Sequence, residues 1–455
     1  MKSKNIDQRK PIILYNELSK FCTMKQNKLM MTEQSYRPRI ADALLQQYLQ
    51  AFGAVCVEGP KWCGKTRTSK EVCNSSIFIG DPANGFSNRT LAKTATELVL
   101  DGAFPRLIDE WQEVPELWDA VRHKVDSLSA RGLYVLTGSA TPNHKGILHS
   151  GAGRIGRLRM RPMSLWESGD STGLVSLKEL SQAKINSTWT GEMDLMRLIH
   201  LIVRGGWPGS LNMDLNSVML VTKQYIQAVL DDDATRIDGV QRDRAKLELV
   251  LRSLARHEST TASVQTLVKD IKSYDEEGLT RSTVNTYLDV YTRLFLIENQ
   301  RPFAPSVRSS VRVKQAEKWH FCDPSLTAAV LKMGPQALLN DLNTLGFLFE
   351  ALCERDLRIY AQALGGELFH YQDYKNQEID AVVSMPDGQW MAFEIKLGAH
   401  QIDEAAANLI KIRDSLNNDN PKSAPSVLCV LCGMTNAAYQ RPDGVFVVPI
   451  TALKP

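Results

Sequence analysis

The stretch GPKWCGKT at residues 59–66 carries glycines, a lysine and a hydroxyl side chain at the spacing G-x-x-x-x-G-K-[ST]. The apolar run AVCVE comes immediately before it and predicts the buried strand that such a loop requires. Glycines let backbone N–H groups turn inward around phosphate oxygens, and the N-terminus of the next helix adds partial positive charge. Lys65 would reach the β and γ phosphates, and the Thr66 hydroxyl would hold Mg²⁺. The spacing therefore predicts a site for a nucleotide triphosphate.

We expect the whole loop to contact the nucleotide, which we take to be ATP with its Mg²⁺. The predicted nucleotide-binding residues are Gly59, Pro60, Lys61, Trp62, Cys63, Gly64, Lys65, Thr66 and Arg67. Because the pattern alone arises by chance in long chains, an acidic partner on a neighbouring strand is the useful test.

The run FPRLIDEWQ supplies such a partner, because an apolar strand ends there in Asp109 and Glu110. One carboxylate would complete the magnesium shell, and the other would orient or deprotonate the attacking water. We assign Asp109, with Thr66, to the metal and Glu110 to the water. The alternative interpretation is an acidic strand end that is only solvated at the surface.

Two further stretches carry polar side chains suited to the γ-phosphate. The strand LYVLTGSA ends in Thr137 and Ser139, small groups that could sense the phosphate from the far side. After it, the stretch SGAGRIGRLRMRPMSLWE contains Arg154, Arg157, Arg159 and Arg161. A guanidinium could neutralise developing charge within the chain or across a subunit interface. The alternative for Arg157 and Arg159 is a solvated basic strand.

A second group of acids lies in NQEIDAVVSMPDGQWMAFEIKLG, where two alternating strands flank a three-residue turn at 386–388 with Gly388 left-handed. That turn places Asp380 opposite Glu394, and Lys396 shares their face. Opposed carboxylates repel unless a cation intervenes, and a divalent metal would resolve this. Glu350, on an upstream helix, could supply a third acid. The alternative is a set of ion pairs, for instance between Lys396 and Glu378.

The middle of the chain predicts helices followed by a basic segment. The stripe Val284, Tyr287, Leu288, Tyr291 and Leu294 predicts a helix with a buried face, capped by Thr280 or Ser282. The order of elements suggests a winged helix-turn-helix. Residues 301–320 hold five cations against one acid, Glu317, so either DNA contact or structural packing is reasonable; the cations are Arg301, Arg308, Arg312, Lys314 and Lys318.

The elements that must position these residues divide the chain into parts. Short apolar runs alternate with amphipathic stretches over residues 36–168, which predicts a parallel sheet covered by helices. A polar, turn-rich stretch at 167–194 predicts a boundary. Residues 190–335 are expected to be mostly helical, and residues 336–455 to form an α/β domain that starts with a helix. Residues 1–35 are expected to be a flexible leader.

Composition narrows the class of protein further. The chain has 455 residues, a net charge of only +3 and 43% hydrophobic residues, as expected for soluble globular domains. Eight scattered cysteines favour reduced thiols in a cytoplasm, and no apolar run is long enough to span a membrane. Cys429 and Cys432 form C-x-x-C within an expected buried strand. His320 and Cys322 stand in an apolar setting, where we expect a structural role.

The order YRPR, GPKWCGKT, LIDEWQ, LTGSA and GRIGRLRMRPMSLWE resembles AAA+-type P-loop ATPases of bacteria and archaea that carry a C-terminal domain related to restriction endonucleases. The resemblance covers nearly all of the chain after the leader. It implies nucleotide and magnesium roles for the loop and acids, a sensor role for Ser139 and a catalytic role for Arg154. The letters KWC within the loop depart from many relatives, which have smaller residues there.

The second group of acids resembles the PD-(D/E)xK nuclease core. Glu350 on a helix, Asp380, and Glu394 with Lys396 follow its order, and Gln401 matches a polar residue that often follows. The resemblance implies a possible second metal site formed by these four residues.

The sequence therefore predicts a cytoplasmic Mg²⁺-dependent ATPase whose nucleotide state moves a winged-helix and a nuclease-like region, acting on DNA. Two alternatives remain open. One is a nucleotide-switched DNA-binding or scaffold protein with an inactive nuclease fold, and the other is a metal-dependent nuclease. An arginine that acts across an interface would require a homo-oligomer.

Overall fold

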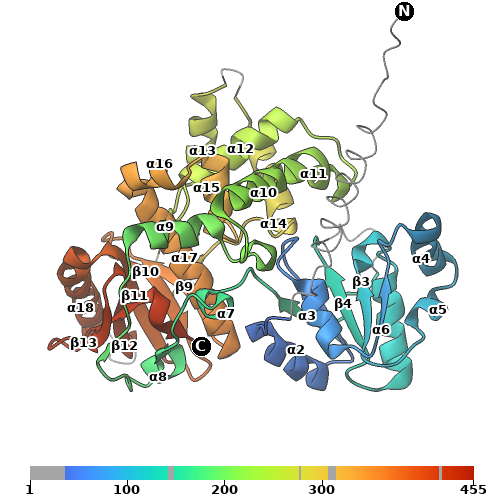
Figure 1. Cartoon of the computed structure of the whole chain (residues 1–455), viewed down its shortest axis with the longest axis horizontal. Coiled ribbons are helices and arrows are strands. Elements are labelled where there is room, and N and C mark those ends of the chain that lie inside the picture. The colour runs from blue at the N-terminus through green and yellow to red at the C-terminus, as the bar shows by residue number, and fades with distance from the viewer. Residues whose placement is uncertain (1–35, 142–147, 276–277, 306–313, 420–422) are drawn as a thin grey trace, which may run out of the picture. The chain divides into compact units, whose positions relative to one another are not determined.

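The computed structural model describes residues 36–141, 148–275, 278–305, 314–419 and 423–455 (Figure 1). Residues Arg39–Pro455 form one compact unit. The predicted leader at 1–35 lies outside the described residues.

The first part of the compact unit is a parallel sheet covered by helices, as the alternating pattern predicts. Its strands pair in the order β2-β3-β4-β1-β5, and every pair is parallel. The strands are β1 (Ala54–Glu58), β2 (Ser75–Phe78), β3 (Arg106–Asp109), β4 (Tyr134–Gly138) and β5 (Ile155–Arg159). The helices are α2 (Ile40–Ala51), α3 (Lys65–Val72), α4 (Ala83–Thr94), α5 (Thr96–Leu100), η1 (Trp111–Glu113) and α6 (Leu117–Leu128).

Strand β1 lies inside this sheet, between β4 and β5. Val55 and Val57 pack in one core cluster with α2, whereas Ala54 and Cys56 pack in another with α6. Burial on both faces explains why the strand reads as a continuous apolar run. Ligands of open parallel sheets bind at the carboxyl ends of the strands, where the phosphate loop begins.

The polar stretch predicted as a boundary is not a bare linker. It contains α7 (Leu165–Ser168), β6 (Val175–Ser176), α8 (Leu177–Ser181) and β7 (Thr188–Trp189). Strand β6 pairs with β15 (Leu453–Lys454), and β7 pairs with β13 (Ala437–Gln440). β6 and β7 are each only two residues long, so neither produces a periodic pattern that the sequence could reveal.

The helical part follows. Its elements are α9 (Leu195–Arg204), η2 (Pro208–Ser210), α10 (Leu215–Ala228), the π-helical turn η3 (Val229–Asp233), α11 (Ala234–Arg236), α12 (Arg244–Arg256), α13 (Val264–Lys272), α14 (Arg281–Arg293), β8 (Arg301–Pro302), α15 (Pro324–Leu331) and α16 (Pro335–Asn340).

Helix α14 carries the predicted stripe, whose five apolar residues are all buried. Of the two predicted caps, Thr280 is the one used, because its hydroxyl accepts a hydrogen bond from the Thr283 N–H. Antiparallel bridges Ile297–Phe321 and Gln300–Lys318 follow the helix. The winged-helix assignment stays a prediction.

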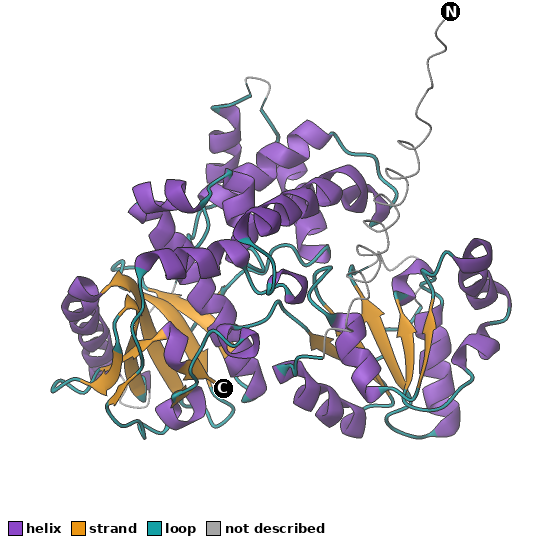
Figure 2. Cartoon of the chain, viewed as in Figure 1, coloured by secondary structure: helices purple, strands orange, loops and turns teal. Residues whose placement is uncertain are grey.

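The last part is a mixed sheet in the order β7-β13-β14-β12-β11-β10-β9-β8 (Figure 2). Its other elements are α17 (Leu342–Ala363), β9 (Glu367–Gln372), β10 (Glu378–Ser384), β11 (Trp390–Gly398), η4 (Ala399–Gln401), α18 (Ile402–Asp419), β12 (Val427–Met434), β14 (Phe446–Pro449) and η6 (Ile450–Ala452). Helices α17 and α18 pack in different core clusters, one against each face. Both edge strands, β7 and β8, come from outside residues 336–455.

The β10–β11 hairpin has the predicted register, in which Ala381 pairs with Phe393 and the Met385 N–H donates to Gln389. Gly388 is left-handed, with φ of 82°, as the turn requires. On β12, Cys429 and Cys432 are free and buried in different core clusters, on opposite faces of the sheet. Opposite faces keep the two thiols apart, so this C-x-x-C is a buried strand.

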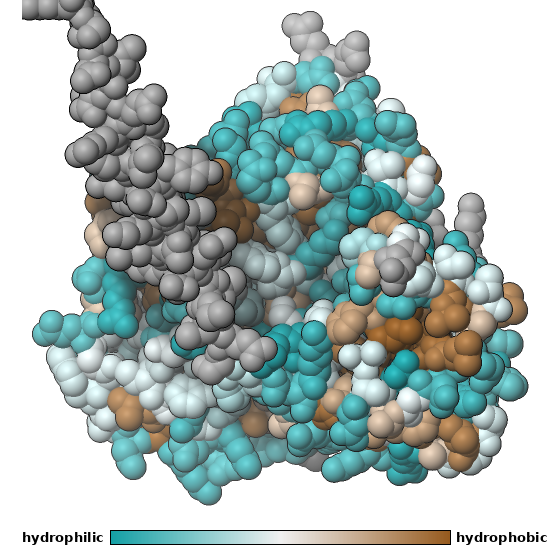
Figure 3. Space-filling model, turned by 45° about the vertical axis from the view of Figure 1, so that its right-hand side comes forward, coloured by the Kyte–Doolittle hydropathy of each residue, from teal (hydrophilic) through white to brown (hydrophobic). Residues whose placement is uncertain are grey.

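On the face shown in Figure 3, teal polar residues are interspersed with white ones, and brown apolar residues gather in a patch on the right. None of the helices in the described ranges combines the length and apolar composition that a membrane span needs.

Candidate functional site

The phosphate loop joins β1 to α3, and its two glycines are required by the backbone. Gly64 precedes the first turn of α3 with φ of 103°, a left-handed conformation that side chains disfavour. A Cβ added at Gly59 would lie 2.0 Å from the carbonyl oxygen of Met160. The loop therefore turns back on itself only because these two positions lack side chains.

Lys65 is the central cation of the loop. Its side chain is buried, with 5% of the residue exposed, and its ammonium donates to the carbonyls of Gly59 at 2.9 Å and Pro60 at 2.8 Å. In the described part of the chain, no carboxylate lies within ion-pair distance of it. These neutral carbonyls position the ammonium group without neutralising its charge, so the Lys65 ammonium can still attract a phosphate.

The predicted acids lie beside the loop, at the end of β3. Asp109 Oδ1 accepts hydrogen bonds from the hydroxyls of Thr66 at 2.8 Å and Thr137 at 2.6 Å. Glu110 Oε2 accepts from Ser139 Oγ at 3.0 Å and also from the Gln112 amide. The structure thus brings Thr66, Asp109, Glu110 and Ser139 together.

Glu110 has a left-handed backbone, with φ of 55° and ψ of 46°. Few residues other than glycine adopt this conformation, and such outliers cluster at functional sites. Here it follows the last residue of β3 and directs the carboxylate toward Ser139 on the neighbouring strand end.

A cavity of about 940 Å³ lies over the loop. Its lining includes the loop residues from Lys61 to Arg67 except Cys63, together with Glu110 and Ser139. The helical part contributes Asp233 and Arg236, which no sequence pattern predicts as site residues because neither belongs to a motif. Small-molecule sites typically occupy about 300–1,000 Å³, so the space suits a nucleotide.

Arg154 does not reach this cavity from its own chain. Its guanidinium pairs with Asp126 at 2.8 Å. The residue precedes β5 and therefore lies at the amino end of a parallel strand, whereas the loop lies at the carboxyl ends. The geometry of this chain therefore does not bring Arg154 to the loop, and a role for Arg154 across a subunit interface stays a prediction.

The other three predicted arginines are also engaged elsewhere. Arg157 pairs with Glu58 at 3.1 Å, Arg159 stacks over the Phe295 ring, and Arg161 binds Glu298 at 2.7 Å. None of them lines the cavity. Of the two arginines for which a solvated strand is the alternative, Arg157 is exposed, whereas Arg159 is partly buried against Phe295.

Arg39 supports the loop from behind, and sequence reasoning assigned it no role. Its buried guanidinium donates to the carbonyl of Cys63 at 2.8 Å and to that of Arg161 at 2.8 Å, and it pairs with Glu167. These partners are distant in sequence, so no spacing could reveal them.

The second predicted group of acids is also assembled, but its cations are lysines. Lys396 Nζ lies 3.0 Å from Asp380 and 2.6 Å from Glu394, between the two opposed carboxylates. The ion pair proposed between Lys396 and Glu378 is wrong, since Glu378 binds another lysine. We call the group Lys318, Glu350, Glu378, Asp380, Glu394 and Lys396 the carboxylate centre.

Lys318 is that other lysine, and it is not a DNA-contacting wing residue. Only 1% of it is exposed, and its ammonium lies 2.9 Å from both Glu350 and Glu378 and 4.0 Å from Asp380. Across the described ranges, no three His, Cys, Asp or Glu residues are grouped so that they could hold a metal ion. The predicted second metal site of Glu350, Asp380, Glu394 and Lys396 is therefore not preformed.

Burial perturbs the acids of the carboxylate centre. It raises the pKa of Glu350 and of Glu394 to about 8, with a further contribution from Asp380. The pKa of Asp380 is lowered, because Lys396 and Lys318 together outweigh the effect of its burial. Four carboxylates thus share two ammonium groups, and protons on Glu350 and Glu394 offset the remaining charge.

Two neighbouring predictions can be placed. His320 is buried, as expected, but not in an apolar setting, since it lies 3.1 Å from Glu258 and 2.6 Å from Glu354. Gln401 accepts a hydrogen bond from the Gly398 N–H, so it caps the turn after β11.

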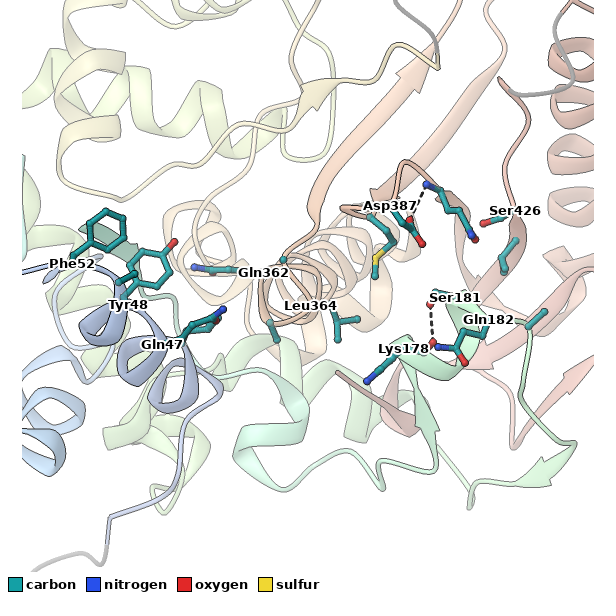
Figure 4. A pocket seen from close by; sticks show the side chains of 18 residues that line it. Gln47, Tyr48, Phe52, Lys178, Ser181, Gln182, Gln362, Leu364, Asp387 and Ser426 are labelled. Atoms are coloured by element: carbon teal, nitrogen blue, oxygen red, sulfur yellow. Dashed lines mark hydrogen bonds between the residues drawn. The ribbon is translucent and has the colours of Figure 1, made fainter. Parts of the chain in front are cut away.

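Figure 4 shows another cavity, of about 1,050 Å³, lined by residues of α2, α8, the end of α17 and the β10–β11 turn. Tyr48 lies on α2 and Phe52 directly follows it, whereas Gln182 and Asp387 lie across the opening. Its lining mixes aromatic, amide and aliphatic side chains. No cluster of buried carboxylates or phosphate-binding amides among the described residues gives it a chemistry, so we do not assign the site there.

Comparisons with known proteins agree with the first site. Residues 51–168 match a family described as an AAA domain, residues 196–337 match a domain of unknown function (DUF8612), and residues 345–453 match another (DUF4143).

Two uncharacterized mycobacterial proteins are similar over most of the chain. They are Mb2031c of Mycobacterium bovis and Rv2008c of Mycobacterium tuberculosis, each 24% identical over 361 residues, or 79% of this chain and 73% of theirs.

Among solved structures, a Walker-type ATPase of Pyrococcus abyssi matches with a TM-score of 0.41 and 12% identity, covering 66% of this chain and 97% of that one. The replication initiator DnaA, bound to AMPPCP and single-stranded DNA, matches with a TM-score of 0.25 and 11% identity, covering 56% of this chain and 86% of that one. The matched family and the loop geometry together show that residues 51–168 form an AAA-type P-loop domain. Two domains of unknown function follow it.

Proposed function

We propose that the protein is a Mg²⁺-dependent ATPase that uses the phosphate-loop site. The observation that carries this proposal is the convergence of Thr66, Asp109, Glu110 and Ser139 beside an unneutralised Lys65. A hydroxyl and a carboxylate 2.8 Å apart offer the hard oxygen ligands that Mg²⁺ prefers. When bound there, the ion would neutralise charge on the β- and γ-phosphate oxygens.

The residues of the chain then have separate tasks. The loop amides and Lys65 hold the triphosphate, and Thr66 and Asp109 hold the metal. Glu110 orients a water for attack on the γ-phosphate and accepts its proton. Ser139 holds the Glu110 carboxylate in place until a nucleotide enters.

We assign to Arg236 the catalytic role at the γ-phosphate that the resemblance implies for Arg154. It lines the cavity, and the described residues include no hydrogen-bond or ion-pair partner for its guanidinium. A free guanidinium can reach the charge that develops on the γ-phosphate.

The experiment compares ATP binding and phosphate release in wild type and Glu110→Gln. The variant should bind ATP as tightly as wild type and release phosphate about 100-fold more slowly, since it keeps the shape but loses the base. Equal turnover in the two proteins would refute the assignment of Glu110, and absence of turnover in wild type would refute the ATPase.

A second candidate, a nucleotide-switched scaffold with an inactive nuclease fold, is favoured by the carboxylate centre. Two lysines there occupy the space between acids that a nuclease would give to a metal. We therefore propose no DNA cleavage by this region. Cleavage of DNA by wild type in Mg²⁺ or Mn²⁺, lost in Asp380→Asn, would contradict this.

DNA as a partner is retained as part of the proposal. Of the cations assigned to a wing, Arg301 is exposed and Lys318 is buried, while Arg308 and Arg312 lie outside the described residues. Turnover measured with and without duplex DNA tests the idea, and an unchanged rate would leave the ATPase without this partner.

A further inference from the structure

Two large residues of the phosphate loop reach across to the helical part. Lys61 Nζ lies 2.5 Å from Asp233 Oδ1. The Trp62 ring stacks on Trp207, with centroids 5.6 Å apart and planes 15° from parallel. Trp207 is fully buried and also packs on Tyr225. Lys61 and Trp62 therefore attach the loop to η3 and to the residue that precedes η2.

Asp233 is placed by the π-helical turn η3, of which it is the last residue. Such turns shift the following side chains around the helix and are frequent at functional sites. The Asp233 side chain is 7% exposed, whereas that of Lys61 is 47% exposed. Elsewhere among the described residues, no second cation lies within ion-pair distance of Asp233.

The position of this carboxylate is unusual, because it lines the same cavity as Lys65 and Thr66. A negative charge in the wall of a phosphate site repels the ligand unless a cation offsets it. Lys61 provides that offset, and it lies on the phosphate loop itself. A triphosphate carries several negative charges and would attract the same ammonium.

We propose that Asp233 is part of the nucleotide site, where it competes with the triphosphate for Lys61. Binding of the nucleotide draws Lys61 from Asp233 and so loosens the helical part from the loop. This inference rests on the proposed function, because it needs a nucleotide in the cavity. In this proposal the coupling between the nucleotide site and the helical part depends on the carboxylate of Asp233.

The test measures Mg-ATP affinity by calorimetry in wild type and Asp233→Asn. Removing the competing charge should tighten binding about fivefold, the effect of one charge at a moderate distance and an intermediate dielectric constant. Asp232→Asn is the matched control, since that neighbouring carboxylate is exposed and does not line the cavity. Its affinity should stay within about twofold of wild type.

A double variant at Lys61 and Asp233 distinguishes competition of Asp233 with the nucleotide from a purely structural role of the ion pair. Lys61→Ala should weaken binding, because it leaves Asp233 unpaired in the cavity wall. Lys61→Ala with Asp233→Asn should bind more tightly than Lys61→Ala alone. Thermal unfolding without nucleotide checks that each variant is folded.

The outcomes are distinct. If wild type binds no ATP, the proposed function fails and this inference fails with it. If wild type binds ATP but Asp233→Asn binds equally or more weakly, only the inference about Asp233 is overturned. Failure of the double variant to improve on Lys61→Ala would also overturn it.

Discussion

The nucleotide site and the carboxylate centre both bring carboxylates and lysines together, yet they arrange the charges in opposite ways. In the nucleotide site, Lys65 binds backbone carbonyls, and Asp109 and Glu110 accept from hydroxyl and amide groups. In the carboxylate centre, Lys318 and Lys396 bind the carboxylates directly. The charges of Lys65, Asp109 and Glu110 thus stay apart from one another, whereas those of the carboxylate centre are joined in ion pairs.

This difference decides which site can receive an outside ligand. Separated charges that rest on neutral partners still gain energy from a phosphate or a metal ion. Charges that already form buried ion pairs would have to break those pairs first, which is costly. The residue types of the two groups are similar. The arrangement of their charges, and not their composition, therefore distinguishes the nucleotide site from the carboxylate centre.

The largest effect is expected when the ion pairs of the carboxylate centre are broken. Lys318→Met should lower the free energy of unfolding by about 3–5 kcal/mol, because it leaves buried carboxylates without their cation. Urea unfolding of the variant against wild type measures it. Lys411→Met, on the exposed side of α18, is the control and should change stability by less than about 0.5 kcal/mol. A stable Lys318→Met would mean that the centre does not depend on its lysine.

Next in size is the loss of Asp109, the proposed metal ligand of the nucleotide site. Asp109→Asn should lower ATP turnover about 10- to 100-fold, as expected when a group that holds or orients a metal is lost. Higher magnesium concentration should restore part of the rate. Asp101→Asn, an exposed acid of the same domain, should behave as wild type. Full activity of Asp109→Asn at low magnesium would argue against a metal at this position.

A smaller effect is expected for the free guanidinium of the nucleotide site. Arg236→Ala should lower turnover at least about tenfold, and Arg154→Ala should change it less than about twofold, because only Arg236 lines the cavity. Rates measured over a range of protein concentrations complete the test. A loss in Arg154→Ala that appears only at high concentration would instead show that this arginine acts across an interface.

The smallest effect concerns pH and the carboxylate centre. Glu394 has a folded-state pKa of about 8, above its ordinary 4.5, so the folded chain holds a proton that the unfolded chain releases. Its contribution to stability is complete below pH 4.5 and is lost as pH rises through 8. From pH 7 to pH 8.5, wild type should therefore lose about 1 kcal/mol relative to Glu394→Gln, which cannot titrate. Unfolding curves at the two pH values measure the difference, and parallel changes in both proteins would contradict it.

The sequence predicts the nucleotide site well because its parts are local. The loop spacing, the apolar run before it and the acid pair at the end of a strand are each contained in a few consecutive residues. The parallel sheet follows from short apolar runs that alternate with helices. The register of the β10–β11 hairpin is equally local, since the turn at 386–388 sets it.

The missed residues act over long sequence separations. Lys318 reaches Glu350, and Arg39 reaches Cys63, through contacts that no spacing encodes. Arg154 was assigned by resemblance, but its place at the amino end of β5 removes it from the cavity. The turn predicts that Asp380 and Glu394 are opposed, but it leaves open whether a metal or a lysine lies between them. The structure has the ion pairs, with Lys396 between the two carboxylates.

The edge strands β7 and β8 have a practical consequence for anyone who isolates the C-terminal sheet. A recombinant fragment starting at residue 336 would lack both, leaving the outer backbone groups of β13 and β9 without their neighbours. Exposed strand edges recruit other chains, so such a fragment should self-associate in solution. Soluble preparations will need to retain residues from before β7 onward.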